Sequence, residues 1–444
     1  MNNSLSTEEI TRFLKKEGPS KAKEVCQYLN ISQAKFSRQI KKLAENIVVI
    51  GKSVNTQYAF KRTIDGRQSE LPIYLIDEKG RAVHAATLTA VYPKLYIIDS
   101  YSSFIATKVY EDLPYWLSDL KPSGFLGRLI PRKYPHLNFP PDIRLWSADI
   151  CISYWSLLAW DLIGNLIIGE KAYQLYQDRL QDHTDHIEED SIVQSYSDTA
   201  DQILQLGAAG SSAGGEQPKF LAIRANDTQP VIVKFSPEGN GQLSCRRKDL
   251  LVMEHLCHKT LNQYQTNLSA RSRLIISDQR VFLEIERFDR DSLSARHGII
   301  SLASLDAEFT ASMGNWREIA SALLKKRIIS KALYSEILFR YYFGALIANT
   351  DMHPWNLSFY CKGEQILKLA PAYDMLPMLY APYHDQIVER EFDLKLPLPQ
   401  DSKIWEETRK IASYFWKAVS QESQVSNNFR DIAKDNLARI ESLA

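Results

Sequence analysis

Three polar residues in the last quarter of the chain have the types and spacing of a phosphoryl-transfer site. Asp351 and Asn356 stand five residues apart in Asn-Thr-Asp-Met-His-Pro-Trp-Asn (349–356), and Asp374 follows 18 residues after Asn356. In kinases one Asp accepts the proton of the attacking hydroxyl, while an Asn and a second Asp hold Mg²⁺ on the nucleotide phosphates. Acidic groups beside phosphates need a metal to offset their charge. We therefore predict a catalytic set of Asp351, His353 and Asn356, with Asn356 and Asp374 as Mg²⁺ ligands.

The surrounding segments suit this role. A loop from Asp351 to Asn356 spans about 15–18 Å when extended, so it can reach both a substrate hydroxyl and a metal. Residues 357–360 and 366–369 have strand patterns on either side of a turn at Gly363. That hairpin would return Asp374 to the side of Asn356. Alone, the motif leaves the alternative open that these are ordinary acidic loop residues near an Asn.

A kinase also needs backbone donors over the phosphates. Residues 207–219 are dense in Gly, Ala and Ser, and glycine lets N–H groups approach phosphate oxygens closely. No Gly-Lys-Ser/Thr follows, so this is not a Walker loop, and an ordinary flexible hairpin is the alternative. We predict phosphate contacts from Ser211, Ser212, Ala213, Gly214 and Gly215.

The remaining parts of a nucleotide site follow in the required order. Lys234 ends the strand pattern Val-Ile-Val-Lys and is predicted to bind phosphates. Glu254, in a helical pattern over 247–261, is predicted to orient it, with Asp249 as a weaker alternative. The strand 281–285 then leads to a connector in which the backbone of Glu286 and Phe288 is predicted to bind the adenine edge. This order predicts a bilobal α+β kinase that uses ATP and Mg²⁺.

The first 62 residues differ in charge from the rest. They hold 12 Lys and Arg against 5 Asp and Glu, whereas the remainder holds 42 against 48. Their pattern predicts three helices, with Ser20 and Ser32 as N-caps, and then a hairpin around Gly51. This is a winged helix-turn-helix, whose third helix enters the DNA major groove. The predicted DNA-binding residues are Gln33, Lys35, Ser37, Arg38, Lys41, Lys42 and Lys52. A protein-docking module or a merely solvated basic surface remains the alternative.

These patterns divide the chain into four predicted domains. They are a winged helix-turn-helix domain (1–62), a β-rich subdomain (70–150), a kinase N-lobe with the Gly-rich loop and phosphate Lys (151–295) and a helical C-lobe (296–444). Residues 63–69 are expected to be a short linker, and 181–190 an exposed connection. The apolar run 154–169 is interrupted by Asp161 and Asn165, which predicts a buried helix and not a membrane span.

Cysteine usage favours a reducing compartment. The five Cys are scattered with no Cys-x-x-Cys pair, so we expect neither a disulfide framework nor a zinc site. The N-terminus is polar and has no apolar signal core. We therefore expect a cytoplasmic protein with no membrane partner.

Four motifs resemble those of the HipA family of bacterial serine/threonine kinases, which are toxins of toxin–antitoxin systems. They are Ser-Ser-Ala-Gly-Gly-Glu-Gln-Pro-Lys (211–219), Glu-Arg-Phe-Asp-Arg (286–290), residues 349–356 and Ala-Tyr-Asp (372–374). The resemblance covers about residues 70–444. With its own N-terminal helix-turn-helix, the chain is similar to the YjjJ type of that family.

The resemblance implies ATP-dependent phosphorylation of a protein Ser or Thr. It implies Asp351 as base, Asn356 and Asp374 on Mg²⁺, and Lys234 on the phosphates. It also implies autophosphorylation of Ser212, which would place nearly two negative charges where the ATP phosphates must sit. A simple turn hydroxyl is the alternative for Ser212. Aminoacyl-tRNA synthetases are known targets in the family, and a HipB-like antitoxin is an optional partner because residues 1–62 could bind DNA in cis.

Two residues depart from the family pattern. Met352 stands where many members have Gly, and Trp355 where they have Lys. Loss of that Lys removes a cation near the transferring phosphate, which puts the rate in question. A non-enzymatic alternative is a DNA-binding transcriptional regulator whose kinase-like body senses nucleotide, although a pure sensor has no need of the base Asp351.

Overall fold

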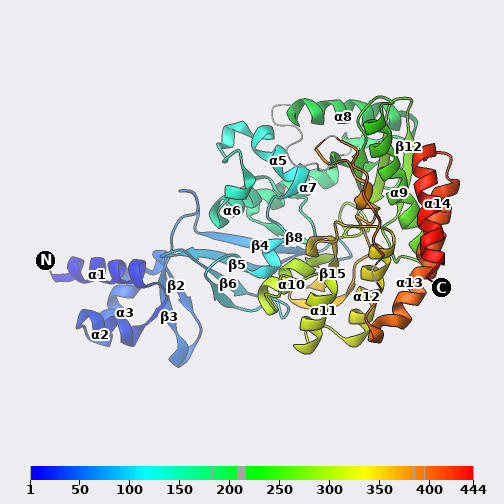
Figure 1. The fold of residues 1–444 in the computed structure, drawn as a ribbon. Coiled ribbons are helices and arrows are strands. Elements are labelled where there is room, and N and C mark those ends of the chain that lie inside the picture. Colours follow the sequence, from blue (N-terminus) through cyan, green and yellow to red (C-terminus); the bar gives the residue numbers. More distant parts are fainter. Residues whose placement is uncertain (1, 183, 208–216, 385, 395, 444) are drawn as a thin grey trace.

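The computed structural model describes residues 1–444 except residues 1, 183, 208–216, 385, 395 and 444. Helices and strands alternate irregularly, and the strands form four separate sheets. In Figure 1 the N-terminal elements lie at one end of the molecule and the C-terminal helices at the other. The middle and C-terminal parts share one large apolar core, which holds Trp155, Trp316 and Trp416.

The N-terminal part, here called the head, has three helices and a three-stranded sheet. The helices are α1 (Asn2–Glu17), α2 (Ala22–Leu29) and α3 (Gln33–Lys42). The antiparallel sheet has the order β1-β3-β2, with strands β1 (Ser20–Lys21), β2 (Ile47–Ile50) and β3 (Gln57–Phe60). Its core contains Ile10, Leu14, Val25, Phe36 and Ile47. The predicted three helices and hairpin are therefore present.

The two N-caps predicted for the head turned out differently. Ser32 caps α3, because its hydroxyl accepts a hydrogen bond from the Lys35 N–H at 3.2 Å. The prediction of Ser20 as the N-cap of α2 was wrong. Ser20 pairs with Tyr58 in the sheet, and its hydroxyl donates to the Gly18 carbonyl. Lys21 precedes α2 instead, and its N–H donates to the Glu24 carboxylate at 2.7 Å.

The head is packed onto the body through residues at the start of, and just before, the predicted linker 63–69. Lys61 forms a β-bridge with Val91, and Ile64 is buried. Arg62 is also buried; its Nη1 atom lies 2.7 Å from Asp149 Oδ2 and its Nε donates to the Val91 carbonyl. These contacts join the head directly to the body.

A five-stranded antiparallel sheet forms the middle unit. Its order is β7-β6-β5-β4-β8, with strands β4 (Glu70–Ile76), β5 (Ala82–Val91), β6 (Leu95–Ser100), β7 (Lys108–Tyr110) and β8 (Leu166–Ile168). The helices of this unit are α4 (Tyr115–Ser118), α5 (Gly124–Lys133), α6 (Ala148–Leu158) and α7 (Glu170–Gln181). The predicted helix over 154–169 was wrong in its second half, because α6 ends at Leu158 and β8 pairs with β4. Since one sheet includes residues on both sides of position 150, we propose that this unit extends beyond that predicted limit.

A second five-stranded sheet, here called the kinase-like sheet, follows in the chain. Its order is β12-β13-β11-β10-β9, with strands β9 (His186–Ile187), β10 (Lys219–Arg224), β11 (Pro230–Phe235), β12 (Ser272–Ile276) and β13 (Val281–Glu286). Helix α8 (Ile192–Gly207) buries Tyr196 against one face, beside Phe220 and Phe282. Helix α9 (Gln242–Tyr264) belongs to the large core. Residues 181–190 are not only a connection, because β9 pairs in parallel with β10.

The C-terminal unit is mainly helical. A small antiparallel sheet contains β14 (Gly298–Ser301), β15 (Ser358–Lys362) and β16 (Gln365–Leu369). The helices are α10 (Leu302–Phe309), α11 (Trp316–Lys325), α12 (Lys331–Leu346), α13 (Ser402–Gln421) and α14 (Asn427–Glu441). The predicted hairpin after Asn356 is confirmed as β15 and β16. Among the helices that the structure describes, none has the length and apolarity needed to cross a membrane.

Candidate active site

Lys234 lies on the central strand β11, where its side chain joins two other parts of the chain. It is 5% exposed, and its Nζ atom lies 2.6 Å and 2.9 Å from the two carboxylate oxygens of Glu254 on α9. The same Nζ atom also contacts Asp374. A buried ammonium is stable only with such partners. The predicted Lys234–Glu254 pair is therefore present, and it extends to Asp374; we call these three residues the catalytic cluster.

The electrostatics of the catalytic cluster follow from this contact. Burial alone would lower the pKa of Lys234, but Asp374 and Glu254 outweigh it and raise that pKa above its usual value. Burial alone would raise the pKa of Asp374, but Lys234 and then Lys219 hold it well below its usual range. Burial raises the pKa of Glu254 against the opposing effect of Lys234. One lysine thus serves two carboxylates, those of the buried Glu254 and the half-buried Asp374, and Asp374 is the one that stays firmly ionised.

Asn349 joins the loops that carry the two predicted catalytic carboxylates. It is buried, its Oδ1 accepts the Asp351 N–H at 3.0 Å, and its Nδ2 donates to the Asp374 carbonyl at 3.4 Å. Sequence reasoning gave Asn349 no role, although it starts the motif 349–356. A buried amide with both ends satisfied is a strong positional constraint. Asn349 therefore keeps the Asp351 and Asp374 loops beside each other.

Asp351 and Asn356 are also connected. The Asn356 Nδ2 atom donates to the Asp351 carbonyl at 2.9 Å, which fixes the amide plane of Asn356. The Asp351 side chain remains accessible, yet partial burial, followed by the charge of Asp374, raises its pKa above the usual value against the effect of His353. A raised pKa brings a carboxylate closer to the range that suits a general base.

His353 and Trp355 occupy the turn between these two residues. The His353 carbonyl accepts from the Trp316 indole N–H at 2.9 Å, and the Trp355 carbonyl accepts from the Tyr373 hydroxyl at 2.6 Å. The two rings meet edge to face at 6.0 Å. Although its backbone is fixed, the Trp355 side chain is 62% exposed. The backbone of the turn is therefore held at two points, and the Trp355 ring is open to solvent.

The β15–β16 hairpin delivers Asp374 as the sequence predicted. Tyr373, its neighbour, hydrogen-bonds Ser358 at the start of β15 as well as Trp355. Asp374 itself has φ 52°, a left-handed conformation that is costly for a residue with a Cβ. Such strain is tolerated where the surrounding structure fixes a residue for a specific task.

Asn356 and Asp374 have the donor chemistry of an Mg²⁺ site. Carboxylate and amide oxygens suit this ion, which usually takes only one or two protein ligands and completes its shell with phosphates and water. The hydrogen bond from Asn356 Nδ2 leaves its Oδ1 as the ligating atom. No group of three His, Cys, Asp or Glu suited to a metal occurs within the described part of the chain. The residues thus fit an ion that is bound together with a nucleotide.

The connector 286–290 is more engaged than predicted. The Glu286 N–H donates to the Arg271 carbonyl at 2.9 Å, and the Phe288 carbonyl accepts from the Tyr360 hydroxyl at 2.9 Å. Only the Glu286 carbonyl and the Phe288 N–H are thus left for an adenine edge. The Phe288 ring lies 5.3 Å from that of Tyr373, which places the connector next to the Asp374 loop.

The charged side chains of this connector have a role that sequence reasoning missed. Arg287, Asp289 and Arg290 are all buried, together with Arg296. Arg287 and Arg290 lie 2.8 Å and 2.9 Å from the carboxylate of Asp161, in the middle unit, and both also pair with Asp289. We call these five residues the anchor cluster. The signal was the alternation of charges in Glu-Arg-Phe-Asp-Arg, but its partner is more than 120 residues away in the chain.

The predicted phosphate-loop residues Ser211, Ser212, Ala213, Gly214 and Gly215 lie outside the described residues. The flanks of that segment are defined. On one side Arg132 Nη1 donates to the carbonyls of Leu206 (3.1 Å) and Gly207 (2.9 Å), at the end of α8. On the other side the Phe235 N–H donates to the Pro218 carbonyl at 3.1 Å. Both flanks are therefore anchored, the second beside Lys234.

The residues predicted to bind DNA lie on one helix and one turn of the head. Gln33, Ser37, Arg38, Lys41 and Lys42 on α3 are exposed, as is Lys52 between β2 and β3, and Lys35 is half-buried. Phe36 faces the core of the head instead. The structure therefore leaves these polar and basic groups accessible.

The fold and the site together define a bilobal, protein-kinase-like class of protein. The YjjJ-like toxin middle domain model matches residues 67–177, and the HipA-like C-terminal domain model matches residues 211–442. Toxin YjjJ of Escherichia coli (strain K12) is 33% identical over 449 residues, covering 98% of this chain and 98% of that protein. The chain belongs to the HipA-like toxin family, in its YjjJ-like branch.

Solved structures agree with this fold. A structure of the toxin–antitoxin system HipA, HipB and its operator DNA from Shewanella oneidensis MR-1 matches 84% of this chain and 96% of its own, with a TM-score of 0.51 at 15% identity. This likeness confirms the predicted HipA-like fold class. The Helicobacter pylori proinflammatory kinase CtkA aligns over 52% of this chain and 90% of its own with a TM-score of 0.37 at 14% identity, and we draw nothing from it.

Proposed function

We propose that this protein is an ATP-dependent serine/threonine protein kinase that acts as a toxin, with a DNA-binding head in the same chain. The observation that carries the proposal is the contact of Lys234 with both Glu254 and Asp374. In kinases a strand Lys must pair with a helix Glu, and a metal-binding Asp must stand beside them. Here three segments far apart in sequence supply these groups.

Each residue of the site has a defined task in this proposal. Asp351 accepts the proton of the substrate hydroxyl as its oxygen attacks the γ-phosphorus, and ADP leaves. Lys234, aimed by Glu254, binds the ATP phosphates, and Asn349 holds the two acidic loops in register. Asn356 and Asp374 would hold Mg²⁺, which neutralises charge on the phosphates. The Glu286 carbonyl and the Phe288 N–H bind the adenine edge.

The assignment of Asp351 is tested by phosphate transfer from labelled ATP. We expect Asp351→Asn to lose roughly 10²–10⁴-fold in rate, the usual contribution of a general base. It should keep ATP affinity, because the hydrogen bonds of Asp351 to Asn349 and Asn356 use backbone atoms. Equal phosphate incorporation by the two proteins would sink this assignment.

Ser212 is the proposed site of autophosphorylation, and the substrate is a protein Ser or Thr. Ser212→Ala should block most self-labelling, and mass spectrometry that finds the phosphate at another residue would refute this. Incubation of the protein with labelled ATP and cell extract would identify the target, for which an aminoacyl-tRNA synthetase is the first candidate. We place the protein in the cytoplasm, where such targets are found.

DNA binding by the head is supported by the exposed polar and basic residues of α3 and Lys52. A HipB-like antitoxin is a further proposed partner, because the related Shewanella HipA was solved with HipB and operator DNA. We expect salt-dependent DNA binding by the full chain, with a salt slope that falls by about one for each lost phosphate contact. Lys41→Ala should lower the slope, whereas Lys171→Ala on α7 should not. Equal slopes for both variants would make the head a protein-docking module.

A nucleotide-sensing transcriptional regulator without phosphotransfer is the competing function. The accessible Asp351 with its raised pKa favours the kinase, because a sensor needs no base. ATP-dependent changes in DNA affinity, with no phosphate transferred to any protein in extract, would favour the regulator.

A further inference from the structure

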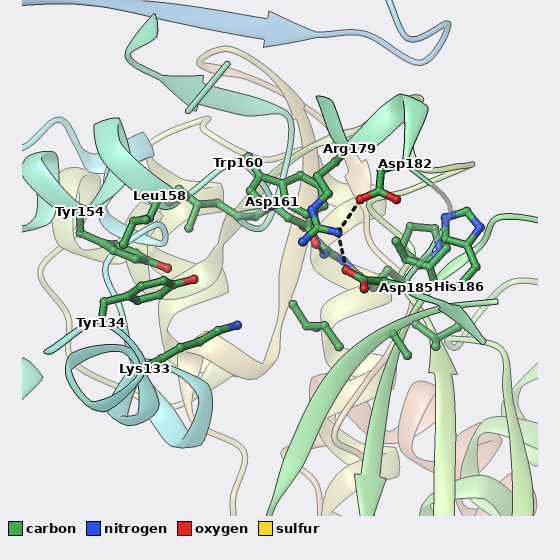
Figure 2. A pocket seen from close by; sticks show the side chains of 18 residues that line it. Lys133, Tyr134, Tyr154, Leu158, Trp160, Asp161, Arg179, Asp182, Asp185 and His186 are labelled. Carbon is green, nitrogen blue, oxygen red and sulfur yellow. Dashed lines mark hydrogen bonds and ion pairs between the residues drawn. The ribbon is translucent and has the colours of Figure 1, made fainter. Parts of the chain in front are cut away.

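A cavity of about 350 Å³ lies between the middle unit and the kinase-like sheet. Figure 2 shows its walls: the end of α5 and part of α6 on one side, the segment after α7 on another, and strands of the kinase-like sheet below. Lys234, Glu254 and Asp374 are not among its lining residues. Its volume is near the lower end of small-molecule sites, which span about 300–1,000 Å³.

One wall carries three donor groups that have no hydrogen-bond or ion-pair partner among the described residues. Lys133 has no ion pair among the described residues, and its Nζ atom lies 5.7 Å from the centre of the Tyr134 ring. No described residue hydrogen-bonds the hydroxyls of Tyr134 and Tyr154. Burial raises the pKa of Tyr154, so its hydroxyl stays protonated. In Figure 2 these three side chains lie together on one side of the cavity. An ammonium and two phenols match the oxygens of a phosphate group.

The facing wall carries acceptors. Arg179 pairs with Asp185 and lies 3.5 Å from Asp182, so a single guanidinium serves two carboxylates. Asp182 Oδ1 already accepts from the N–H and the hydroxyl of Thr184. A carboxylate has about four lone-pair positions, and Arg179 occupies only one oxygen of Asp185. Hydroxyl groups of a ligand are the natural donors for such acceptors. Between the two walls, the ring of Trp160 and the side chain of Leu221 supply apolar surface.

A surplus of positive charge lies behind this cavity. The anchor cluster holds three guanidinium groups against two carboxylates, and its members Asp161 and Arg287 line the cavity. Arg296 is fully buried, and its Nε and Nη2 atoms have no hydrogen-bond partner within the described chain. Its Nη1 donates to the Trp160 carbonyl, directly behind the lining residue Trp160. Buried charge of one sign attracts a ligand of the other.

We propose that this cavity binds a sugar phosphate, either free or as the ribose phosphate of a mononucleotide. Its phosphate lies against Lys133, Tyr134 and Tyr154, and its hydroxyls donate to Asp185. The sugar itself packs on Trp160, because C–H groups suit the negative face of an aromatic ring.

The location suggests an effector of the nucleotide site. Lys133 follows Arg132, which donates to the last carbonyls of α8 immediately before the Gly-rich segment. If the proposed kinase function holds, occupancy of the cavity changes the KM for ATP. Thermodynamic linkage makes this effect reciprocal. The effector changes the affinity for ATP by some factor, and ATP changes the affinity for the effector by the same factor.

The binding test uses calorimetric titration of the full chain without ATP, so it does not depend on kinase activity. The probes are ribose 5-phosphate, AMP and inorganic phosphate. We expect ribose 5-phosphate to bind wild type, Lys171→Ala and Asp374→Asn equally. Lys133→Ala should weaken binding about tenfold, or about 1.4 kcal/mol. Tyr154→Phe should weaken it about threefold, and Mg·ATP binding should be unchanged in both variants. If AMP binds more tightly than ribose 5-phosphate and its binding depends on Lys133, the ligand is a mononucleotide. If the two affinities are equal, the ligand is the free sugar phosphate.

Three outcomes would overturn the proposal. The first is that ribose 5-phosphate and Mg·ATP compete strictly and that Lys133→Ala weakens the affinity for both ligands equally. That result would make the cavity part of the nucleotide cleft. Another is equal affinity for inorganic phosphate, which would leave the acceptor wall without a role. The third is the absence of Lys133-dependent binding of either sugar phosphate at about 1 mM, the weak end of specific affinities.

Discussion

The catalytic cluster and the anchor cluster are both buried groups of charges, but they have opposite surplus charge and different access to solvent. In the catalytic cluster Lys234 serves the carboxylates of Glu254 and Asp374, an excess of one negative charge. The anchor cluster holds the guanidinium groups of Arg287, Arg290 and Arg296 but only the carboxylates of Asp161 and Asp289, an excess of one positive charge. Each joins segments far apart in the chain, so each also stabilises the arrangement of the units.

The difference in exposure separates the two roles. The Asp374 side chain is 34% exposed, whereas those of Asp289 and Arg290 are 5% and 0% exposed. A ligand can therefore reach a carboxylate of the catalytic cluster directly, and the negative surplus there suits a cation bound with phosphates. The anchor cluster reaches the cavity only through its two lining members, Asp161 and Arg287. A buried group of charges can therefore be purely structural. A charged atom that solvent can reach is what distinguishes a candidate reactive site.

The largest expected effect is that of Lys234→Met. Phosphotransfer should fall at least 10³-fold, because the γ-phosphate loses a preorganised cation. Stability should also fall, by about 3–5 kcal/mol, since Glu254 is 1% exposed and would be left without a cation. Kinetics with labelled ATP and urea unfolding measure the two effects. The double variant Lys234→Met, Glu254→Gln should regain stability but not activity. If it regains both, Lys234 stabilises the fold and has no separate role in catalysis.

The anchor cluster is tested by Asp161→Asn. Removing this carboxylate leaves three buried arginines with Asp289 alone, so the free energy of unfolding should fall by about 3–5 kcal/mol. The rate per folded molecule should stay within about twofold of wild type. The matched control is Asp227→Asn: Asp227 is 47% exposed in its pair with Arg224 and should cost under about 1 kcal/mol. A loss of catalytic rate equal to that of Lys234→Met would mean that the anchor cluster takes part in the chemistry.

The sequence predicted the catalytic cluster better than the anchor cluster for a physical reason. Lys234, Glu254 and Asp374 each stand in a local pattern with a known chemical use: a strand lysine, a helix glutamate and an Asp after a hairpin. Order along the chain was enough to connect them. Asp161 has no such pattern, because it lies in a short segment after α6 that resembled a continuing helix. Its partners are defined only by the packing of two units.

The fold shows the same limit. The three helices of the head and the β15–β16 hairpin were predicted from local patterns. The parallel strand β9 has only two residues and pairs with a strand more than 30 residues later, so no local signal revealed it. Within the predicted linker 63–69, Ile64 belongs to the large core of the body, and no local pattern revealed that contact. The structure of these segments is determined by tertiary contacts and not by local propensity.

A pH series distinguishes the two clusters by sign. The folded pKa of Asp289 is held below its usual value: burial alone would raise it, but Arg287 and Arg290 outweigh burial. Its stabilisation is therefore complete above the unfolded pKa, near 4, and is lost as pH falls through the folded value. The folded pKa of Glu254 is raised by burial, so its cost at neutral pH is relieved as pH falls through that pKa.

The measured quantity is the difference in unfolding free energy between wild type and each variant, from urea titrations at pH 6 and pH 3. For Asp289→Asn this difference should shrink by about 1 kcal/mol on acidification, the size expected for one depressed carboxylate. For Glu254→Gln it should move the other way. If this difference changes in the same direction for both variants, the two clusters respond alike to protonation. That result would contradict the distinction drawn from their opposite surplus charge.

The smallest expected effect concerns Trp355→Lys, which adds a cation beside the negative surplus of the catalytic cluster. The Trp355 side chain is 62% exposed, and its backbone is held through Tyr373, so a lysine fits there without loss of packing. Stability should stay within about 0.5 kcal/mol. A solvated lysine interacts weakly through water and salt, so we expect kcat to rise by up to about threefold, more at low than at high ionic strength. Trp355→Met, which removes the ring without adding charge, is the control in steady-state kinetics. If Met raises kcat as much as Lys, the aromatic ring restricts access to Asp351, and the charge surplus of the cluster does not limit the rate.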